Sequence, residues 1–412
     1  MYRKIIFGIS PLFLFVHALA AAELQPLPKP PPASEYKAPP GRSPEMQAFD
    51  KAVLYLEATQ ERDGHWDAAK SGGSPEFSGL NGDIAITALA TEALVRTSQG
   101  KIQDPAALAH AKRALEWLLN HTQPDGRVAD ESAPGEPVIS QMFAANLYLQ
   151  TSSMSTRPRL RDAATTTINY ALKNMTASCG GYGAAPKSST ARSDITGLAT
   201  YLFASARMES ITFDSKDVAP PSPAVPTKVK PDVELENNIK AGLKLLMSDS
   251  EKKSHKYVAV SGDTQADWDS TLSGAMAQTL LLVTLSSMKN GMNFIYGDLD
   301  EKTQTYPTLQ AHLQWGKSGE GYKAMSLWQG TIAMAYNYSD NTPQLKNWIT
   351  AARAILFDHQ SPDGSWPVAG PDTARGKIFR TALHALTLVW LAPPPQPAPP
   401  PPQDLVLPPP EK

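Results

Sequence analysis

The sequence predicts an all-α protein in which outer and inner helices form a closed (α/α)6 toroid with disordered Pro-rich tails. Three observations support this fold class. A glycine turn recurs along the chain, an amphipathic segment precedes each copy, and a segment that is apolar nearly all round follows it. A helix that is apolar on every side is buried on every side, so the alternation predicts two concentric layers.

The first element, residues 1–22, is predicted to be a secretory signal peptide. Arg3 and Lys4 form a short positive region, residues 5–16 form an apolar run, and small residues at 18–22 offer cleavage sites. The run is short for a membrane span, which needs about 20 residues. We therefore expect export to the periplasm or the extracellular space, and an uncleaved anchor is the alternative.

Three tracts collect most of the 37 prolines. Residues 23–44 and 393–412 are expected to be an extended linker and a tail, because proline lacks a donor and fixes φ. Residues 219–231 are expected to be a loop inside the toroid domain, which spans 45–392. The Pro-rich tails can contact a protein or the cell envelope.

The outer helices are predicted from segments with one apolar stripe. In 46–60, Phe49 and Leu56 share the stripe, and the Ser43-Pro44 pair is a helix start signal. The other predicted outer segments are 106–122, 159–174, 233–250, 308–316 and 345–360.

The inner helices are predicted from apolar segments rich in Ala, Gly, Ser and Thr, whose small side chains let neighbouring helices approach closely. These segments are 83–95, 138–150, 194–208, 269–284, 325–338 and 379–391.

The glycine turn is predicted to have structural roles. In the first copy, Gly64 can adopt a positive φ after a helix end. We expect Trp66 to pack back over the preceding helix and Gln60 to satisfy free groups at a neighbouring helix end. Further copies, some of them degenerate, lie at 123–127, 179–183 and 360–366.

The Gln-x3-Gly-x-Trp pattern at 60–66 and 360–366 resembles the QW motif of squalene/terpenoid cyclases and protein prenyltransferase β subunits. Segments 193–208 and 378–391 are also similar to the helices that follow those turns. The resemblance spans about 46–391 and implies an α/α toroid, of which this chain, with its predicted export signal, would be a non-standard member. It says little about activity, because a fold does not fix a function.

Composition limits the class of protein further. Hydrophobic residues make up 42% of the 412 residues and the net charge is −2, which argues for a globular body without a nucleic-acid partner. One cysteine, Cys179, excludes an internal disulfide and a multi-cysteine zinc module. No cofactor and no metal are expected.

Acidic residues are predicted to gather at one mouth of the ring. The inner helices run in the same direction, so their positive amino ends converge there. The acids near these ends are Asp83, Glu136, Asp194, Asp267 and Asp269. For Asp83 and Asp194 the first interpretation is N-capping, and ligand binding is the second.

The segment Asp267-Trp268-Asp269-Ser270-Thr271 resembles the Asp-x-Asp-Asp-Thr motif of class II terpenoid cyclases. The resemblance implies that Asp269 protonates a polyene double bond or epoxide, with Asp267 as the neighbour that keeps it protonated. Ser270 replaces the last aspartate of the family motif, which weakens the acid pair. The family usually uses two helical domains, and this chain has room for one.

The zinc site of prenyltransferases resembles an Asp-x-Cys pair plus a distant histidine. Here Asp269 stands where the cysteine should be, and His384 lies in the last inner segment without a matching thiol. The ligand set for zinc is therefore incomplete.

Carbohydrate chemistry is a third class, because helical toroids also host glycoside hydrolases and polysaccharide lyases. Paired carboxylates could hydrolyse a glycoside, and a lyase would need a positive group such as Lys377 or Arg380. Aromatic side chains such as Tyr182 suit sugars, although aromatic residues of inner helices are more often core.

The sequence favours binding of a lipid, glycan or protein in or over the cavity, with catalysis not evident, because the scaffold motif is intact beside degraded catalytic motifs. Cyclase-like protonation by Asp269 and a carbohydrate-active lyase or hydrolase remain alternatives. Candidate catalytic residues are Asp269 and Asp267. Candidate ligand-binding residues are Asp83, Asp194, Trp268, Tyr322, Trp328, Arg380 and His384.

Overall fold

The computed structural model describes residues 27, 29–96, 104–153, 158–177, 181–208, 324–337, 342–368 and 374–392. Within these ranges the secondary structure is helical, without a strand, and one isolated bridge joins Thr176 and Tyr182. None of the helices described combines the length and the apolar character needed to cross a membrane.

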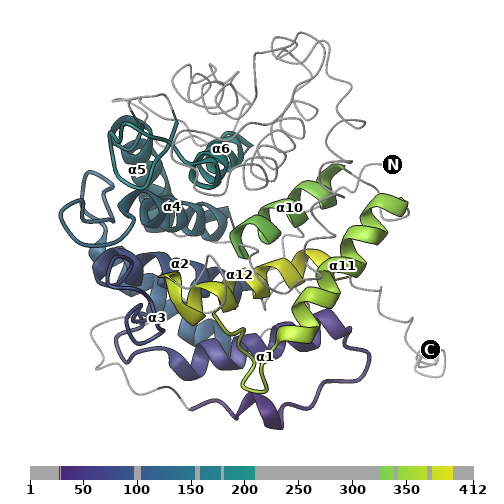
Figure 1. Cartoon of the computed structure of the whole chain (residues 1–412). Helices are drawn as coiled ribbons and strands as arrows, with labels where there is room; N and C mark the ends of the chain where they lie inside the picture. The colour runs from purple at the N-terminus through teal and green to yellow at the C-terminus, as the bar shows by residue number, and fades with distance from the viewer. Residues whose placement is uncertain are drawn as a thin grey trace, which may run out of the picture.

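The helices alternate between an outer and an inner layer along the chain, as the sequence predicts (Figure 1). The outer helices are α1 (Pro44–Thr59), α3 (Pro105–His121), α5 (Pro158–Asn174) and α11 (Pro343–His359). The inner helices are α2 (Leu80–Arg96), α4 (Pro137–Ser153), α6 (Ser193–Met208), α10 (Ala324–Asn337) and α12 (Gly376–Leu391).

Burial separates the two layers. Helix α1 buries one stripe that includes Phe49, Val53 and Leu56, whereas α2 and α12 bury nearly every residue of their length. Each outer helix described begins at a proline. Proline suits the first helical position because its fixed φ is helical and because an N–H at that position would have no partner within the helix. The predicted division into amphipathic and fully buried helices is therefore confirmed for these helices.

The inner helices pack side by side and the chain closes on itself. Helix α2 packs against α4 and α4 against α6, while α10 packs against α12 and α12 packs against α2. Figure 1 shows α12 beside α2 and α1, so the last inner helix lies next to the first inner and first outer helices. This is the arrangement of an α/α toroid. The predicted helices at 233–250, 269–284 and 308–316, the loop at 219–231, and the segments 1–22 and 393–412 lie outside the described residues.

The glycine turns at 60–66, 123–127 and 360–366 each pack against the next outer helix. The contacts are Gly64 with Arg113 of α3, Gly126 with Thr166 of α5, and Gly364 with Lys51 of α1. A Cβ atom on these glycines would approach backbone atoms to 2.6, 2.0 and 2.1 Å respectively, and all three glycines have positive φ. The last turn makes the same contact with α1 that the earlier turns make with α3 and α5. The ring is therefore closed by the same turn-to-helix contact that joins neighbouring repeats.

The turn tryptophans pack back over the preceding helix, as predicted. Trp66 donates from Nε1 to the carbonyl of Leu56 at 2.9 Å, and Trp366 donates in the same way to Leu356 at 2.8 Å. Both indole rings are completely buried. Burying a tryptophan costs little when its only donor is satisfied, so each ring contributes its full apolar surface to the core.

The turn glutamines bond a neighbouring helix, but not at its end. Gln60 donates from Nε2 to the carbonyl of its own turn glycine and to that of His110 in α3. Gln360 does the same with its turn glycine and Ala48 in α1. The expectation of a helix-end partner is wrong, because both acceptors lie inside the neighbouring helix, where the side chain fixes one repeat to the next.

Candidate functional site

Four charged side chains meet where the amino ends of α4, α6 and α12 come together. Glu136 directly precedes α4, Arg192 and Asp194 lie at the start of α6, and Arg375 directly precedes α12. They come from three inner helices that are far apart in the sequence. We call these four residues the rim network.

The rim network is continuous. Arg192 binds Asp194 through two parallel bonds, Nη2 to Oδ2 at 2.6 Å and Nε to Oδ1 at 3.1 Å, and its Nη1 donates to Glu136. Arg375 donates to Oε2 of Glu136 from Nη2 at 2.8 Å and from Nε at 3.0 Å. Arg375 also lies 3.7 Å from Asp194 and sits over the ring of Phe379. The two acids therefore share two guanidinium groups.

Burial and charge together set the ionisation of the rim network. Burial alone would raise the pKa of Glu136, but the guanidinium groups of Arg375 and Arg192 outweigh it and hold that pKa below its ordinary value. Burial likewise disfavours the charged form of Arg192, but Asp194 and Glu136 raise its pKa. Glu136 and Arg192 are therefore charged at neutral pH.

The four side chains of the rim network are unequally exposed. Asp194 and Arg375 expose 2% and 8% of their side chains, whereas Arg192 and Glu136 expose 22% and 18%. A ligand at the rim would therefore meet Arg192 and Glu136 first, with Asp194 and Arg375 behind them.

The connecting loops fix this rim in place. Asn81, buried at the start of α2, donates from Nδ2 to backbone carbonyls between residues 130 and 134. On the other side, the amide of Ser74 donates to Ala374 and the amide of Lys377 donates to Ser71. The loops before α2, α4 and α12 are thus bonded to one another, which positions Glu136 and Arg375.

Asp83 lies outside the rim network. Helix α2 begins at Leu80, and Oδ1 of Asp83 accepts a hydrogen bond from the amide of Ala68 at 2.7 Å. The expectation that Asp83 caps its own helix is therefore wrong, because the carboxylate holds the preceding loop instead. Burial raises its pKa. Asp194 accepts from the amide of Ile195, but its main partners are the arginines of the rim network.

The candidate ligand-binding residues Trp328 of α10 and Arg380 and His384 of α12 are buried. Trp328 and His384 are buried and pack edge-on against Tyr201 and Trp366 respectively. Burial, with Arg380 nearby, holds the pKa of His384 well below its ordinary value, so the imidazole is neutral. These contacts support packing rather than ligand binding for both side chains.

The remaining candidates divide between other contacts and undescribed residues. Tyr182 is buried, and Lys377 lies 3.6 Å from Asp363 and over the ring of Tyr55. Asp267, Trp268, Asp269, Tyr322 and Cys179 lie outside the described residues. Within the described ranges, no three His, Cys, Asp or Glu side chains are grouped so as to hold a metal ion.

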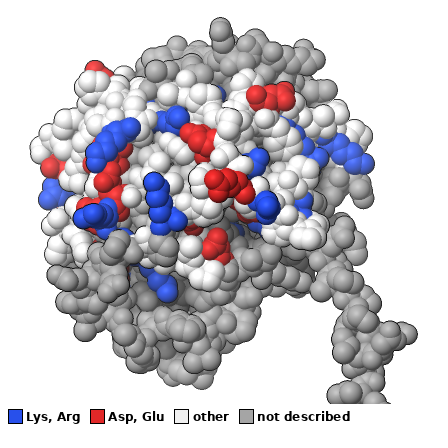
Figure 2. All heavy atoms as spheres, turned by 90° about the horizontal axis from the view of Figure 1, so that it is seen from below, with Lys and Arg blue, Asp and Glu red and all other residues white. Residues whose placement is uncertain are grey.

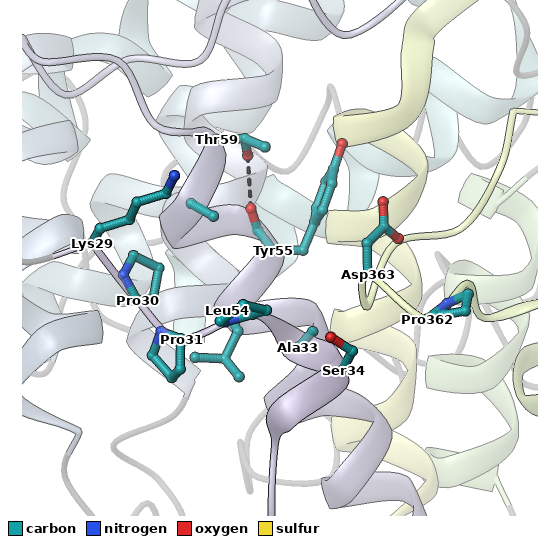
Figure 3. Close-up of a pocket in the computed structure, with 12 residues that line it drawn as sticks. Lys29, Pro30, Pro31, Ala33, Ser34, Leu54, Tyr55, Thr59, Pro362 and Asp363 are labelled. Carbon is teal, nitrogen blue, oxygen red and sulfur yellow. Dashed lines mark hydrogen bonds between the residues drawn. The ribbon is translucent and has the colours of Figure 1, made fainter.

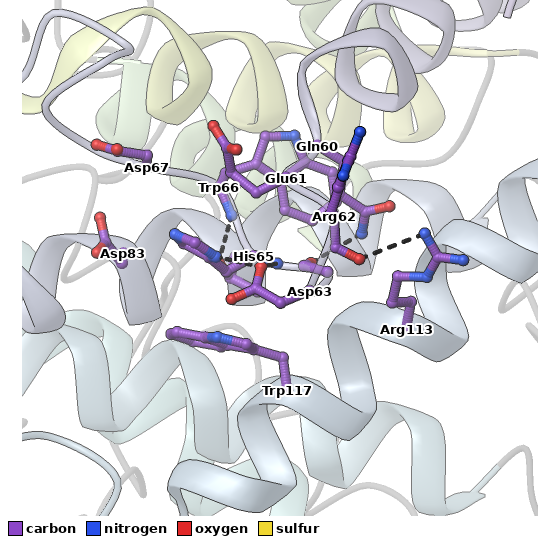
Figure 4. A network of polar contacts seen from close by, with 12 residues as sticks. Gln60, Glu61, Arg62, Asp63, His65, Trp66, Asp67, Asp83, Arg113 and Trp117 are labelled. Carbon is purple, nitrogen blue, oxygen red and sulfur yellow. Dashed lines mark hydrogen bonds and ion pairs between the residues drawn. The ribbon is translucent and has the colours of Figure 1, made fainter. Parts of the chain in front are cut away.

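A histidine and an aspartate also pair in the first glycine turn (Figure 4). His65 Nδ1 lies 2.5 Å from Oδ1 of Asp63, and the imidazole stacks on Trp117 with ring centroids 5.0 Å apart. However, Asp125 and Asp363 accept backbone bonds two residues ahead in their own turns, as Asp63 does. Asp63 therefore belongs to the turn scaffold, and its backbone bond recurs in turns that have arginine or serine at the position of His65.

Sequence reasoning missed both arginines of the rim network. Each lies one residue before an inner helix, where an acid is the expected type. For Arg192 the available signal is its place beside the predicted amino-end acid Asp194, whereas Arg375 stands beside no such acid. On the face that Figure 2 shows, the acidic and basic side chains of the described residues are intermixed. Among the described residues on that face, a ligand selected by charge alone finds no single-sign surface.

Comparisons with known proteins find similarity among solved structures. No protein-family model matches the sequence, and no curated protein is detectably similar to it. Among solved structures, a protein from Actinoplanes is 15% identical, with a TM-score of 0.42, over 84% of this chain and 98% of that one. The type II terpene cyclase MstE from Scytonema, in a variant bound to geranylgeranyl dihydroxybenzoate, is 13% identical, with a TM-score of 0.45, over 84% and 97%.

An inactive variant of the α-1,6-mannanase GH76A of Salegentibacter, in complex with a mannotetrose, is 10% identical, with a TM-score of 0.49, over 84% of this chain and 98% of that chain. At these identities and TM-scores the similarities carry no information about substrate or reaction. The toroid assignment rests on the packing of the described helices.

Proposed function

We propose that this protein is exported and binds a ligand over the amino-end rim of its toroid, and that binding rather than catalysis is the role of this rim. The observation that supports the proposal is the rim network, in which both acids are paired with arginines. A general acid or base needs a pKa near the working pH, and Arg375 and Arg192 move the pKa of Glu136 away from it.

The network favours a ligand that can both donate and accept hydrogen bonds. Arg192 offers only donors and Glu136 offers only acceptors, and the two are held side by side at the exposed edge. Hydroxyl groups can pair with both. We therefore favour a glycan over a hydrocarbon, because a few fixed polar groups orient a ligand best when it can satisfy all of them.

The test is binding of neutral and acidic oligosaccharides by the full chain, measured by calorimetry, beside native mass spectrometry of protein purified from its host. Arg192→Lys keeps the charge but removes the two-pronged contact with Asp194, and we expect at least tenfold weaker binding. The matched control is Arg159→Lys, which changes an exposed pair on the outer layer. Empty spectra together with an oligosaccharide panel that does not bind would contradict the proposal.

A second candidate function is proton-driven cyclisation, which the segment Asp267-Trp268-Asp269 supports by its resemblance to the cyclase motif. Incubation with squalene and shorter polyprenols tests it. Turnover that disappears in Asp269→Asn but persists in Arg192→Lys would favour this function over binding at the rim. Turnover that Asp269→Asn leaves unchanged would remove Asp269 from that role.

A further inference from the structure

The Pro-rich segment before α1 lies across the place where the two ends of the toroid meet. We call residues 29–43 the strap. It contains a short 3-10 turn, Ala33–Glu35, and Ala33 is buried. The Cβ of Ala33 lies 3.2 Å from the position that a Cβ on Gly364 would take, so the strap touches the last glycine turn.

The strap is also bonded to the first outer helix. Tyr36 donates from its hydroxyl to Oδ2 of Asp50 at 2.5 Å, and Arg42 donates to both oxygens of the same carboxylate at 2.8 and 2.5 Å. Asp50 precedes Lys51, whose backbone contacts Gly364. One carboxylate of α1 therefore anchors the strap one residue away from the closing contact of the ring.

The closing contact joins parts of the chain that are far apart. The bond from Gln360 to Ala48 spans 312 residues, whereas the equivalent bond from Gln60 to His110 spans 50. Closing a longer loop costs more conformational entropy, although the cost rises only slowly with length. Of these two contacts, the one at the seam between the last turn and α1 therefore costs more conformational entropy to form.

The strap bridges this seam without filling it. Figure 3 shows Ala33 and Ser34 of the strap beside Leu54 and Tyr55 of α1, with the turn at Pro362 and Asp363 across from them. Between these parts runs a groove of about 750 Å³. The strap is therefore held at a few points. These are the contact of Ala33, the bonds to Asp50, and, at its end, the bond from Gln47 to the carbonyl of Arg42 and the cap that Ser43 forms on α1. Most of its other residues are exposed.

We propose that the strap is a clasp that holds the last glycine turn against α1 and so keeps the toroid closed. Its contacts reach both sides of the seam, α1 through Asp50 and the last turn through Ala33, which is what a clasp requires. The segment before α1 then couples the N-terminal side of the chain to ring closure. This role does not depend on which ligand the rim binds.

Amide hydrogen exchange on the full chain tests the clasp with Asp50→Asn, which removes the charge that holds both Tyr36 and Arg42. We expect exchange at least tenfold faster in the strap and in the turn at 360–366. The turns at 60–66 and 123–127 should stay within about twofold of the parent protein, because their partners on α3 and α5 are untouched. Asp162→Asn, at an exposed aspartate of α5, is the matched control.

A second variant, Ala33→Arg, displaces the strap from the other side of the seam and should give the same pattern. A strap that exchanges faster while the turn at 360–366 keeps its protection would overturn the proposal. Equal acceleration in every turn would also overturn it, because that result means general destabilisation. So would a strap that stays protected in both variants.

Discussion

At the residue scale, charged groups that are buried with partners behave differently from those buried without them. In the rim network each acid lies between guanidinium groups, so the charges compensate one another. Glu57 in α1 is also buried, but its Oε1 has no hydrogen-bond partner within the described structure. The two sites should therefore respond to mutation in opposite directions.

Removing Arg375 should destabilise the protein strongly, because Glu136 then stays buried with one guanidinium partner fewer. We expect Arg375→Met to lower the free energy of unfolding by about 2–4 kcal/mol, measured by urea denaturation. Arg159→Met breaks an exposed pair with Glu116 and should cost less than about 0.5 kcal/mol. Equal losses in the two variants would show that the rim network contributes no more than a surface ion pair.

Glu57 should make stability fall as the pH rises. Burial, with a smaller effect of Asp104, raises its pKa from 4.5 to about 8 in the folded protein. The unfolded chain therefore releases this proton at lower pH than the folded chain does. The contribution to stability is greatest below about pH 4.5 and is lost progressively up to about pH 8.

Glu57→Gln removes this dependence. We expect it to raise the free energy of unfolding by about 4 kcal/mol at pH 8 relative to its effect at pH 4, since each pKa unit between 4.5 and about 8 corresponds to about 1.4 kcal/mol. The matched control is Glu61→Gln, which changes a partly exposed carboxylate paired with Lys70. Urea unfolding at both pH values measures the effect of each variant, and a pH-independent effect of Glu57→Gln would contradict the assignment.

At the scale of the elements, the glycine turn is the joint of the repeat. Its tryptophan binds its own outer helix, its glycine contacts the next outer helix, and its glutamine bonds that helix as well. In the second repeat, a glutamine outside the turn makes the equivalent contact. Gln141 of α4 donates to the carbonyl of Gly126 and to that of Thr167 in α5. The contact is therefore kept even where the motif is degenerate.

The close approach at the turn glycine predicts a large effect of one methyl group. Gly364→Ala places a Cβ 2.1 Å from the carbonyl of Lys51 and also strains a positive φ. Gly72 has a similar φ, but a Cβ there has nothing within 4 Å, so Gly72→Ala isolates the strain. We expect about 1–2 kcal/mol of destabilisation for Gly72→Ala and at least about 2 kcal/mol more for Gly364→Ala, measured by thermal and urea unfolding.

At the scale of the whole molecule, the packing of α12 against both α1 and α2 closes the ring. Removing α12 exposes the apolar faces of its neighbours at once. A chain that ends after residue 374 should lose cooperative thermal unfolding and aggregate, as measured by circular dichroism and size-exclusion chromatography. A chain that ends after Ala392 should unfold like the parent protein. Cooperative unfolding of the shorter chain would show that the ring closes without α12.

The sequence by itself determined the layers of this protein. Alternating amphipathic and fully apolar segments specify outer and inner helices, because the stripe of apolar residues decides which side is buried. It also specified the role of Trp66 and Trp366, since a turn of fixed length brings the ring onto the preceding helix. The sequence did not specify the helix that Gln60 bonds, because the acceptor, the carbonyl of His110, lies 50 residues away on α3.

Only the tertiary structure decided which charges meet at the rim and what covers the seam. Arg192 and Arg375 are 183 residues apart and share Glu136 only because ring closure brings the starts of α4, α6 and α12 together. Asp83 carries the same local signal as Asp194 but holds a loop instead. Local sequence fixes where an acid sits on a helix, while its charge partner depends on long-range packing, which no local pattern encodes.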